Sequence, residues 1–360
     1  MRPLAAFALA AALVSCAAPG LRTVNNDLAK SYADPVGFLH RAAGAGDLMA
    51  VMRCVEEGFT APDARDPYGW TACMYAARGG HDGVIEYLVA KGADLKLVSP
   101  DGDSALTVAI DGGRPESAAY IIGAGGAVKT RDAGGNSPFM KAAVRGYADL
   151  VPELAARGFD INEPNNAGAT PLLASLRARY FDVAAVLLEK GANPDAGDAA
   201  GVTPLFLCIE NRYSDTLDLL LARGADPNVR DAHGRSALLV AMDQGQPDVA
   251  GRLLKRGADP GMADENGRTP LHAAVLGGLA DLARLLADRG AGPNARDRDG
   301  TTPLMIAAYY GRDDLVRFLV ERGADTQLVN NAGKTAAMLA RESRFETVAA
   351  FLDARAKGGR

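Results

Sequence analysis

The chain has 360 residues, of which 48% are hydrophobic and 6% aromatic, and its formal charge at pH 7 is −5. This length suits about two ordinary domains or one long array of repeats. Glycine is abundant at 41 residues, and such a composition packs many thin layers more easily than one thick core. Acidic and basic residues are interspersed, which argues against the basic face of a nucleic-acid-binding protein. Beyond the N-terminus no apolar run reaches about 18 residues, so no internal membrane span is expected.

The N-terminus has the pattern of a targeting segment. Arg2 precedes an apolar stretch of eleven residues that begins at Leu4, which is too short to cross a bilayer and typical of a signal peptide. The letters LVSC, which end at Cys16, resemble the lipobox of bacterial lipoproteins. The resemblance implies removal of residues 1–15 as a signal peptide and lipidation of Cys16. Because Ala17 and not Asp follows the cysteine, it also implies an outer-membrane location facing the periplasm. An ordinary secretory signal cleaved near the same place is the alternative.

Residues 16–36 show no clear helical or strand period, and we expect them to form a tether. Several acyl chains at Cys16 would anchor the chain stably, whereas a single chain binds a membrane only marginally. The folded part is therefore expected to stay close to the membrane surface.

A short pattern recurs along the rest of the chain with a period of 33 residues. Each copy has a Ser or Thr, with a Gly two residues before it and an Asp, Asn or Ser five residues before it. The short polar residue and the Gly predict a tight turn with positive φ at the Gly. The hydroxyl residue predicts a helix N-cap, which Pro often follows in the first turn. The nine hydroxyl residues are Thr71, Ser104, Ser137, Thr170, Thr203, Ser236, Thr269, Thr302 and Thr335.

A second helix is predicted in each copy, because apolar residues recur at i, i+3 and i+4, as in Leu282, Leu285 and Leu286. In eight of the nine copies a Gly stands 21 residues after the hydroxyl residue, where a left-handed residue commonly ends a helix. A tenth, incomplete copy precedes the others from Gly37. The last copy has Ala356 in place of the closing Gly, which suits a terminal cap.

This pattern resembles the ankyrin repeat over about residues 37–356. The resemblance implies an all-α solenoid, a stack of helix-turn-helix units with projecting β-hairpin-like loops, in which each unit contacts only its neighbours. We expect an N-terminal cap at 37–65, repeats at 66–329 and a C-terminal cap at 330–358. In the family, the loops and the first helices form a concave face that binds other proteins.

Catalytic, cofactor and metal motifs are not found in the sequence. It has no His-x-x-x-His, Cys-x-x-Cys or Ser-nucleophile pattern. The Asp residues occur one per loop and not in a cluster, which argues against calcium sites. His272 and His40 share one position of the repeat, where the family histidine supports the turn by hydrogen bonding. We therefore expect no enzyme activity and no cofactor.

Two cysteines, Cys54 and Cys73, are expected in neighbouring buried positions of the first two units. A disulfide between them would link the N-terminal cap in the oxidising periplasm, and two packed thiols are the alternative. Cys208 occupies a small core position of a first helix.

The family offsets also predict a partner-binding surface at the loop tips and on the exposed side of the first helices. Trp, Tyr and Arg are the residues most enriched at binding hot spots. For Tyr68 and Trp70, the alternative is that their rings cover the N-terminal cap. The candidate residues are Tyr68, Trp70, Arg78, Arg145, Arg177, His233, Arg235, Asn266, Arg268, Arg298, Tyr309 and Tyr310.

Three copies have Arg in place of the Gly before the second helix, and an aromatic residue follows it. They are Arg179-Tyr180, Arg212-Tyr213 and Arg344-Phe345. Local packing over the helix turn is one interpretation, and a second contact patch is the other.

These features predict a monomeric, non-catalytic protein–protein interaction module, lipid-anchored in a bacterial envelope, that binds no nucleic acid. A periplasmic inhibitor or immunity protein that blocks one toxin or enzyme is an alternative form of binding. An enzyme would require a site that the sequence does not predict. A cytosolic ankyrin adaptor would require the signal-peptide interpretation to be wrong.

Overall fold

The computed structural model of the protein describes residues 33–358. In this range the chain forms twenty helices and no strand, with isolated antiparallel bridges at Val98–Ser104 and Arg230–Ser236. The helices fall into two compact units, residues 33–192 and residues 193–358. The predicted all-helical repeat fold is confirmed. The predicted signal peptide, with Cys16 and most of the tether, lies outside the described residues.

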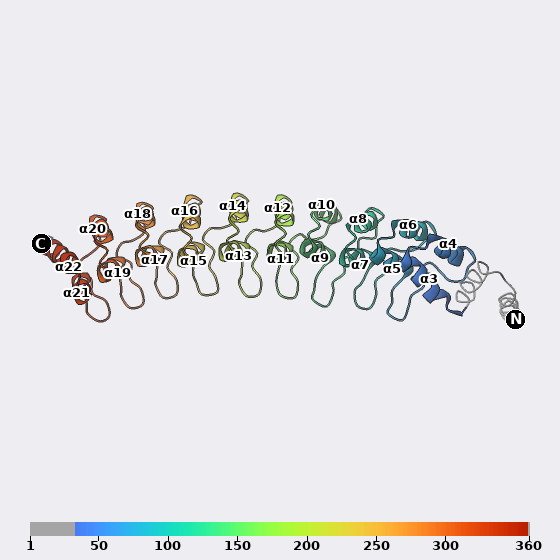
Figure 1. The fold of residues 1–360 in the computed structure, drawn as a ribbon, viewed down its shortest axis with the longest axis horizontal. Helices are drawn as coiled ribbons and strands as arrows, with labels where there is room; N and C mark the ends of the chain where they lie inside the picture. Colours follow the sequence, from blue (N-terminus) through green and yellow to red (C-terminus); the bar gives the residue numbers. More distant parts are fainter. Residues whose placement is uncertain (1–32, 359–360) are drawn as a thin grey trace, which may run out of the picture. The chain divides into compact units, whose positions relative to one another are not determined.

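In the first unit, short helices alternate between two rows (Figure 1). The first helix of each repeat stands in the row from which the hairpin loops project, and the second helix stands in the other row. The first helices are α3 (Pro35–Ala45), α5 (Ala72–Gly79), α7 (Ala105–Asp111), α9 (Pro138–Arg145) and α11 (Pro171–Arg177). The second helices are α4 (Leu48–Glu56), α6 (Asp82–Ala90), α8 (Pro115–Gly123), α10 (Leu150–Ala156) and α12 (Phe181–Glu189).

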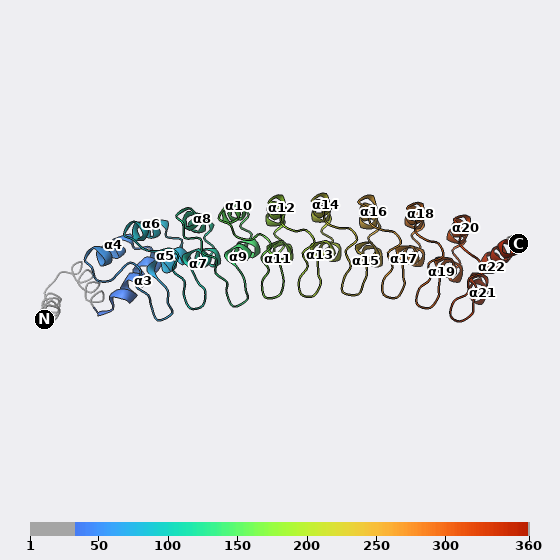
Figure 2. The ribbon, with the colours of Figure 1, turned by 180° about the vertical axis from the view of Figure 1, so that it is seen from behind.

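The second unit repeats this arrangement, and the two rows are equally clear from behind (Figure 2). Its first helices are α13 (Pro204–Asn211), α15 (Ala237–Asp243), α17 (Pro270–Gly277), α19 (Pro303–Tyr309) and α21 (Ala336–Glu342). Its second helices are α14 (Ser214–Ala222), α16 (Pro247–Lys255), α18 (Ala280–Asp288), α20 (Asp313–Glu321) and α22 (Glu346–Gly358). None of the helices in the described range has the length and hydrophobicity that a membrane span requires.

The turn before each first helix has the predicted geometry. The Gly two residues before the hydroxyl has a positive φ in all nine copies, from Gly69 at 81° to Gly333 at 71°. In seven copies the Ser or Thr side chain accepts a hydrogen bond from the backbone N–H three residues later. Thr71 makes no such bond, and Thr269 bonds to a histidine side chain instead. The predicted turn is therefore confirmed in all copies and the direct N-cap in most of them.

The short polar residue closes each hairpin. In the hairpin of Asp231, the backbone N–H of this residue donates to the carbonyl of Arg235 at 3.0 Å. Its carboxylate accepts the backbone N–H groups of His233 (2.9 Å) and Arg235 (2.8 Å). Burial alone would raise the pKa of Asp231, but these hydrogen bonds outweigh it and lower the pKa. The carboxylate is thus committed to the turn.

The core consists of thin apolar layers. In the repeat of α17 and α18, Leu271, Ala274 and Val275 of the first helix and Ala283 and Leu286 of the second are fully buried. Burying one such Leu or Val side chain stabilises the fold by about 1.5–3 kcal/mol. Because a single helix pair can bury only one side, each repeat depends on its neighbours for stability.

Four arginines also join neighbouring hairpins within a unit. Each guanidinium donates to the backbone carbonyl at the equivalent position of the next repeat. The bonds are Arg65 to Val98 (2.8 Å), Arg131 to Pro164 (3.2 Å), Arg230 to Ala263 (2.7 Å) and Arg296 to Val329 (2.8 Å).

His272 uses both ring nitrogens to join two repeats. Nε2 lies 3.1 Å from the carbonyl oxygen of Thr301, which can only accept, so Nε2 carries the proton. Nδ1 then accepts from the backbone N–H of Thr269 at 3.2 Å and lies 2.8 Å from its hydroxyl. Burial lowers the pKa of His272 from its usual value. The ring is a neutral structural element with no nitrogen available for chemistry.

The three arginines that replace a turn glycine adopt that glycine's backbone conformation. Arg179, Arg212 and Arg344 have φ of 65°, 60° and 66°, and they are the non-glycine residues with positive φ in the described chain. The left-handed region costs an L-residue about 1–2 kcal/mol. Each of these arginines therefore strains its helix turn.

Replacing Arg344 by Gly should relieve this strain. We expect Arg344→Gly to raise the free energy of unfolding by about 0.5–1 kcal/mol, after the greater entropy of Gly in the unfolded chain is subtracted. Urea unfolding followed by circular dichroism measures it. Gly245 (φ 64°) is the matched control, because an added Cβ there would meet open space. Gly245→Ala should lower stability by about 1 kcal/mol, and equal stability of all three proteins would contradict the argument.

The buried ring of His272 should make stability depend on pH. Its lowered pKa means that the unfolded chain binds the proton more readily than the folded chain does. The contribution of His272 to the free energy of unfolding is therefore fully present above about pH 6.5 and is lost as the pH falls below that value. His272→Met, which introduces the buried residue found at Met140 and Met305, should weaken this acid-induced loss. Urea unfolding between about pH 8 and about pH 5.5 tests it. An identical pH dependence in the variant would show that His272 is not the group responsible.

Candidate functional site

In each unit, the hairpins and the exposed side of the first helices form a continuous surface that we call the hairpin face. Because the hairpin aspartates and turn glycines fix the backbone, side chains at equivalent positions recur from repeat to repeat on this face. The twelve candidate partner residues all belong to the hairpin face of one unit or the other.

An aromatic row begins the hairpin face of the first unit. The ring of His40 stacks on Tyr75 at 5.1 Å, and Tyr75 meets Trp70 edge-on at 5.2 Å. The Tyr75 hydroxyl donates to Asp66 at 2.7 Å. Burial and this bond raise the pKa of Tyr75 to about 12. Tyr68, at the hairpin tip, is 73% exposed. Trp70 therefore contributes to packing near the cap, whereas Tyr68 is presented to solvent.

Trp70 also contacts the next repeat. Its indole Nε1–H donates to Asp103 Oδ2 at 3.1 Å, and the guanidinium of Arg78 lies 5.8 Å from the indole ring centroid. These side chains, with Val108, Asp111 and Gly112, line an open pocket of about 260 Å³. The pocket combines an aromatic wall with groups of both charges.

Lys141 lies between two carboxylates beside this pocket. Its Nζ is 2.5 Å from Asp111 Oδ2 and 3.3 Å from Asp132 Oδ2, and its side chain is only 11% exposed. Burial alone would lower the pKa of Lys141, but the hydrogen bond and charge of Asp111, together with Asp132, raise it. The exposed Arg145 lies 3.6 Å from the other Asp111 oxygen. Asp111 is therefore largely neutralised by its neighbours.

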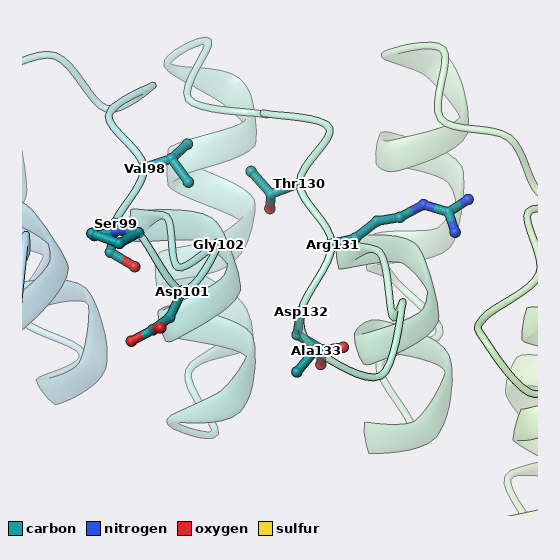
Figure 3. A pocket seen from close by; sticks show the side chains of 9 residues that line it. Val98, Ser99, Asp101, Gly102, Thr130, Arg131, Asp132 and Ala133 are labelled. Carbon is teal, nitrogen blue, oxygen red and sulfur yellow. The ribbon is translucent and has the colours of Figure 1, made fainter.

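A second hollow, of about 730 Å³, lies between the hairpins that precede α7 and α9 (Figure 3). Val98 and Thr130 are placed across it, and the buried Thr130 hydroxyl has no hydrogen-bond partner. Arg131 points away toward the next repeat, where it pairs with Glu163 at 2.6 Å. Asp101 and Asp132 stand on the two hairpins. The hollow is a gap between loops and has no cation in its lining that points inward.

The hairpin face of the second unit has a different, apolar centre. Tyr309 and Tyr310 are each 49% exposed, and their rings meet edge-on at 5.1 Å. Arg312 lies 5.5 Å from the Tyr310 ring while its guanidinium donates to the carbonyls of Val275 and Leu276. Leu276 is 41% exposed in the preceding repeat. These residues form an exposed aromatic and aliphatic patch.

The remaining candidates divide into ion-paired and exposed side chains. Arg235 binds Asp231 of its own hairpin at 2.7 Å, and Arg268 binds Asp243 of the preceding repeat at 2.8 Å. These two arginines are part of the hairpin structure. His233, Asn266 and Arg298 are exposed at hairpin tips, and the exposed Arg177 ends α11.

The sequence interpretation missed four residues of the first unit's site, namely Tyr75, Asp103, Asp111 and Lys141. The 33-residue period could have indicated such neighbours, because residues 33 apart occupy equivalent positions in adjacent repeats, as Trp70 and Asp103 do. The interpretation weighted Trp, Tyr and Arg and passed over the carboxylates that hold them.

Two of the three aromatic residues that follow a turn arginine pack locally over a helix turn. Tyr180 lies over Gly146 and Phe345 over Gly311, each so close that an added Cβ would overlap the ring. A contact patch that includes both Tyr180 and Tyr213 stays a prediction.

The three cysteines of the described chain, Cys54, Cys73 and Cys208, are buried, and no disulfide joins Cys54 to Cys73. The Cys54 thiol donates to the carbonyl of Pro35 at 3.7 Å. Burial raises the pKa of Cys73 and of Cys208 to about 12, so both are unreactive thiols near neutral pH. A disulfide between Cys54 and Cys73 stays a prediction.

The described residues contain no group of three His, Cys, Asp or Glu side chains arranged to hold a metal ion. The buried polar side chains are mainly the N-cap hydroxyls and the two structural histidines. What the surface offers chemically is recognition by aromatic, charged and hydrogen-bonding groups.

Comparison with known proteins agrees with this description. The family model for ankyrin repeats in three copies matches residues 39–132, 139–231, 205–297, 238–330 and 289–358. Human NAD-capped RNA hydrolase NUDT12 is 33% identical over 67 residues, 19% of this chain and 14% of that protein. Mouse ankyrin repeat domain-containing protein 40 is 32% identical over 65 residues, 18% of each chain. The matches thus span less than a fifth of either relative.

The similarity to the hydrolase is confined to repeats and carries no evidence of catalysis. Ankyrin repeats generally mediate binding to other proteins and are generally non-catalytic. The family match covers most of the described residues and agrees with their turns, caps and helix pairs. The chain belongs to the ankyrin repeat family.

Proposed function

We propose that this protein is a non-catalytic protein-binding module, held by a lipid on Cys16 at the outer membrane and facing the periplasm. The observation that carries the binding role is the contrast between two sets of side chains. The Asp, Ser, Thr and His side chains of the turns are committed to the fold. Tyr68, Tyr309 and Tyr310 remain exposed on the hairpin faces.

A preformed surface of this kind favours a folded partner. The hairpin backbones are fixed by Asp carboxylates and by arginines from the preceding repeat, so little conformational entropy is lost when a partner binds. Exposed tyrosines add contact area with few rotatable bonds. We infer that the protein acts as a monomer that binds another protein.

Two features of the sequence support the lipid anchor. The apolar stretch from Leu4 to Val14 is too short to cross a bilayer, and Cys16 follows it in the LVSC pattern. The residues up to 32 would then connect the anchor to α3. The first unit would remain close to the membrane.

The binding role can be tested by crosslinking in intact cells, affinity capture and mass spectrometry. We expect that Tyr68→Ala combined with Tyr309→Ala and Tyr310→Ala removes a partner that the wild-type protein captures. Exposed tyrosines at a hot spot each contribute about 1–2 kcal/mol or more. Trp70 is left intact because its indole also supports the fold.

Met49→Ala is the matched control, since Met49 is 68% exposed but lies on α4, away from the hairpin face. The control should retain every partner. If the triple variant keeps the wild-type partners while its helical content is unchanged, the hairpin face is not the binding surface.

The anchor can be tested separately. Cys16→Ala should abolish acylation and move the protein from the membrane fraction to another fraction of the cell envelope or the cell. Fractionation and intact-mass spectrometry of the N-terminal peptide measure this. A wild-type N-terminus at Cys16 without acyl chains, or a mature protein that begins elsewhere, would contradict the lipoprotein proposal.

A further inference from the structure

The pocket between the first two full repeats has a rigid aromatic wall. The indole of Trp70 is held by its hydrogen bond to Asp103 and by the edge-on ring of Tyr75. Asp103 is itself positioned by a hydrogen bond from its backbone N–H to the Ser99 hydroxyl at 3.0 Å. The wall is therefore fixed by contacts to two repeats of the same unit.

The floor of the pocket depends on a glycine. Helices α5 and α7 approach so closely here that a Cβ on Gly112 would lie 2.7 Å from the carbonyl oxygen of Arg78. Beside it the side chain of Val108 is buried. The open space that these residues line is about 260 Å³.

One carboxylate that lines this space has an oxygen available to a ligand. Asp103 and Asp111 line it, and among the described residues Asp103 Oδ1 accepts no hydrogen bond while Oδ2 holds the indole. The last carbonyl groups of α7 also place partial negative charge next to Gly112. Lys141 and Arg145 neutralise Asp111 from beside the pocket, which leaves Asp103 as its uncompensated anion.

The molecule already places a guanidinium in this environment. Arg78 is exposed, forms no ion pair among the described residues and lies 5.8 Å from the Trp70 ring centroid. Such a cation–π contact contributes about 0.5–1 kcal/mol at an exposed site and more when it is desolvated. Arg78 therefore occupies the place that a cationic ligand would take. It can move into solvent at the small free-energy cost of this cation–π contact.

We propose that this pocket binds the guanidinium of an arginine side chain on the partner protein. The planar group stacks on the Trp70 indole and donates to the free oxygen of Asp103, while Arg78 moves aside. Arginine suits the site better than lysine because one guanidinium can stack and donate at the same time. The inference rests on the proposed function and names the partner chemistry at one end of the hairpin face.

The chain's single tryptophan is a built-in reporter. The indole N–H of Trp70 gives one resonance in a ¹H–¹⁵N spectrum of residues 17–360, which contain every described helix. The probe is the acetylated, amidated peptide Gly-Gly-Arg-Gly-Gly. The control peptide has citrulline in place of arginine, which preserves shape and removes the charge. We expect a saturable shift with the arginine peptide and a much smaller shift with citrulline.

Asp103→Asn should lower the affinity for the arginine peptide about fivefold, as expected for one partly exposed ion pair, while its amide oxygen still accepts the indole N–H. Asp243→Asn is the control, because it makes the same Asp-to-Asn change at the end of α15, in the second unit. This control should leave the titration unchanged.

Three results would overturn the proposal: no saturable shift, equal shifts with both peptides, or an affinity that Asp103→Asn does not reduce although the variant keeps its helical content. None of them bears on the capture experiment. A partner lost in the tyrosine variant would still support the binding role of the hairpin face. Loss of arginine binding together with an unchanged partner list in that variant would instead argue against both.

Discussion

No repeat of this protein can bury its apolar residues alone, and the rest of the structure follows from this constraint. Each helix pair is two short helices thick, so Leu271 and Leu286 become fully buried only when neighbouring pairs cover them. The hydrogen bonds between repeats also make each repeat depend on its neighbour. The arginines at Arg65 and Arg296 and the ring of His272 all reach a backbone carbonyl of the next repeat. Folding and stacking are thus one process within each unit.

The same constraint separates residues that fold from residues that bind. A repeat must keep its turn, its caps and its two apolar sides, which leaves the hairpin tips and the exposed ends of the first helices free to vary. At one equivalent position near the end of the first helix, successive repeats of the first unit have Arg78, Asp111, Val144 and Arg177. Variation at a position that the fold does not constrain is where a repeat protein can encode recognition of a partner.

The sequence was sufficient to predict the repeat because its signals are backbone requirements. Positive φ at Gly69 and Gly333, the N-cap at Ser236 and the hydrogen-bonded carboxylate of Asp231 each follow from local chemistry. It was not sufficient for the site, because Trp70 and Asp103 meet only after two repeats have stacked. Likewise, Lys141 lies between Asp111 of the preceding repeat and Asp132 of its own hairpin only once the repeats have stacked.

For Trp70, packing near the N-terminal cap and contact with a partner are compatible roles. The indole N–H at the edge of the ring serves the fold through its bond to Asp103, and the ring also packs against Tyr75. Arg78, a side chain that is exposed and makes no ion pair among the described residues, lies over the ring at 5.8 Å from its centroid. An aromatic ring that is held at its edge loses little entropy when a ligand covers its face, so structural anchoring improves it as a binding surface. Removing the whole side chain would confound the two roles, whereas changing Asp103 alters the charge presented to a ligand and keeps the ring in place.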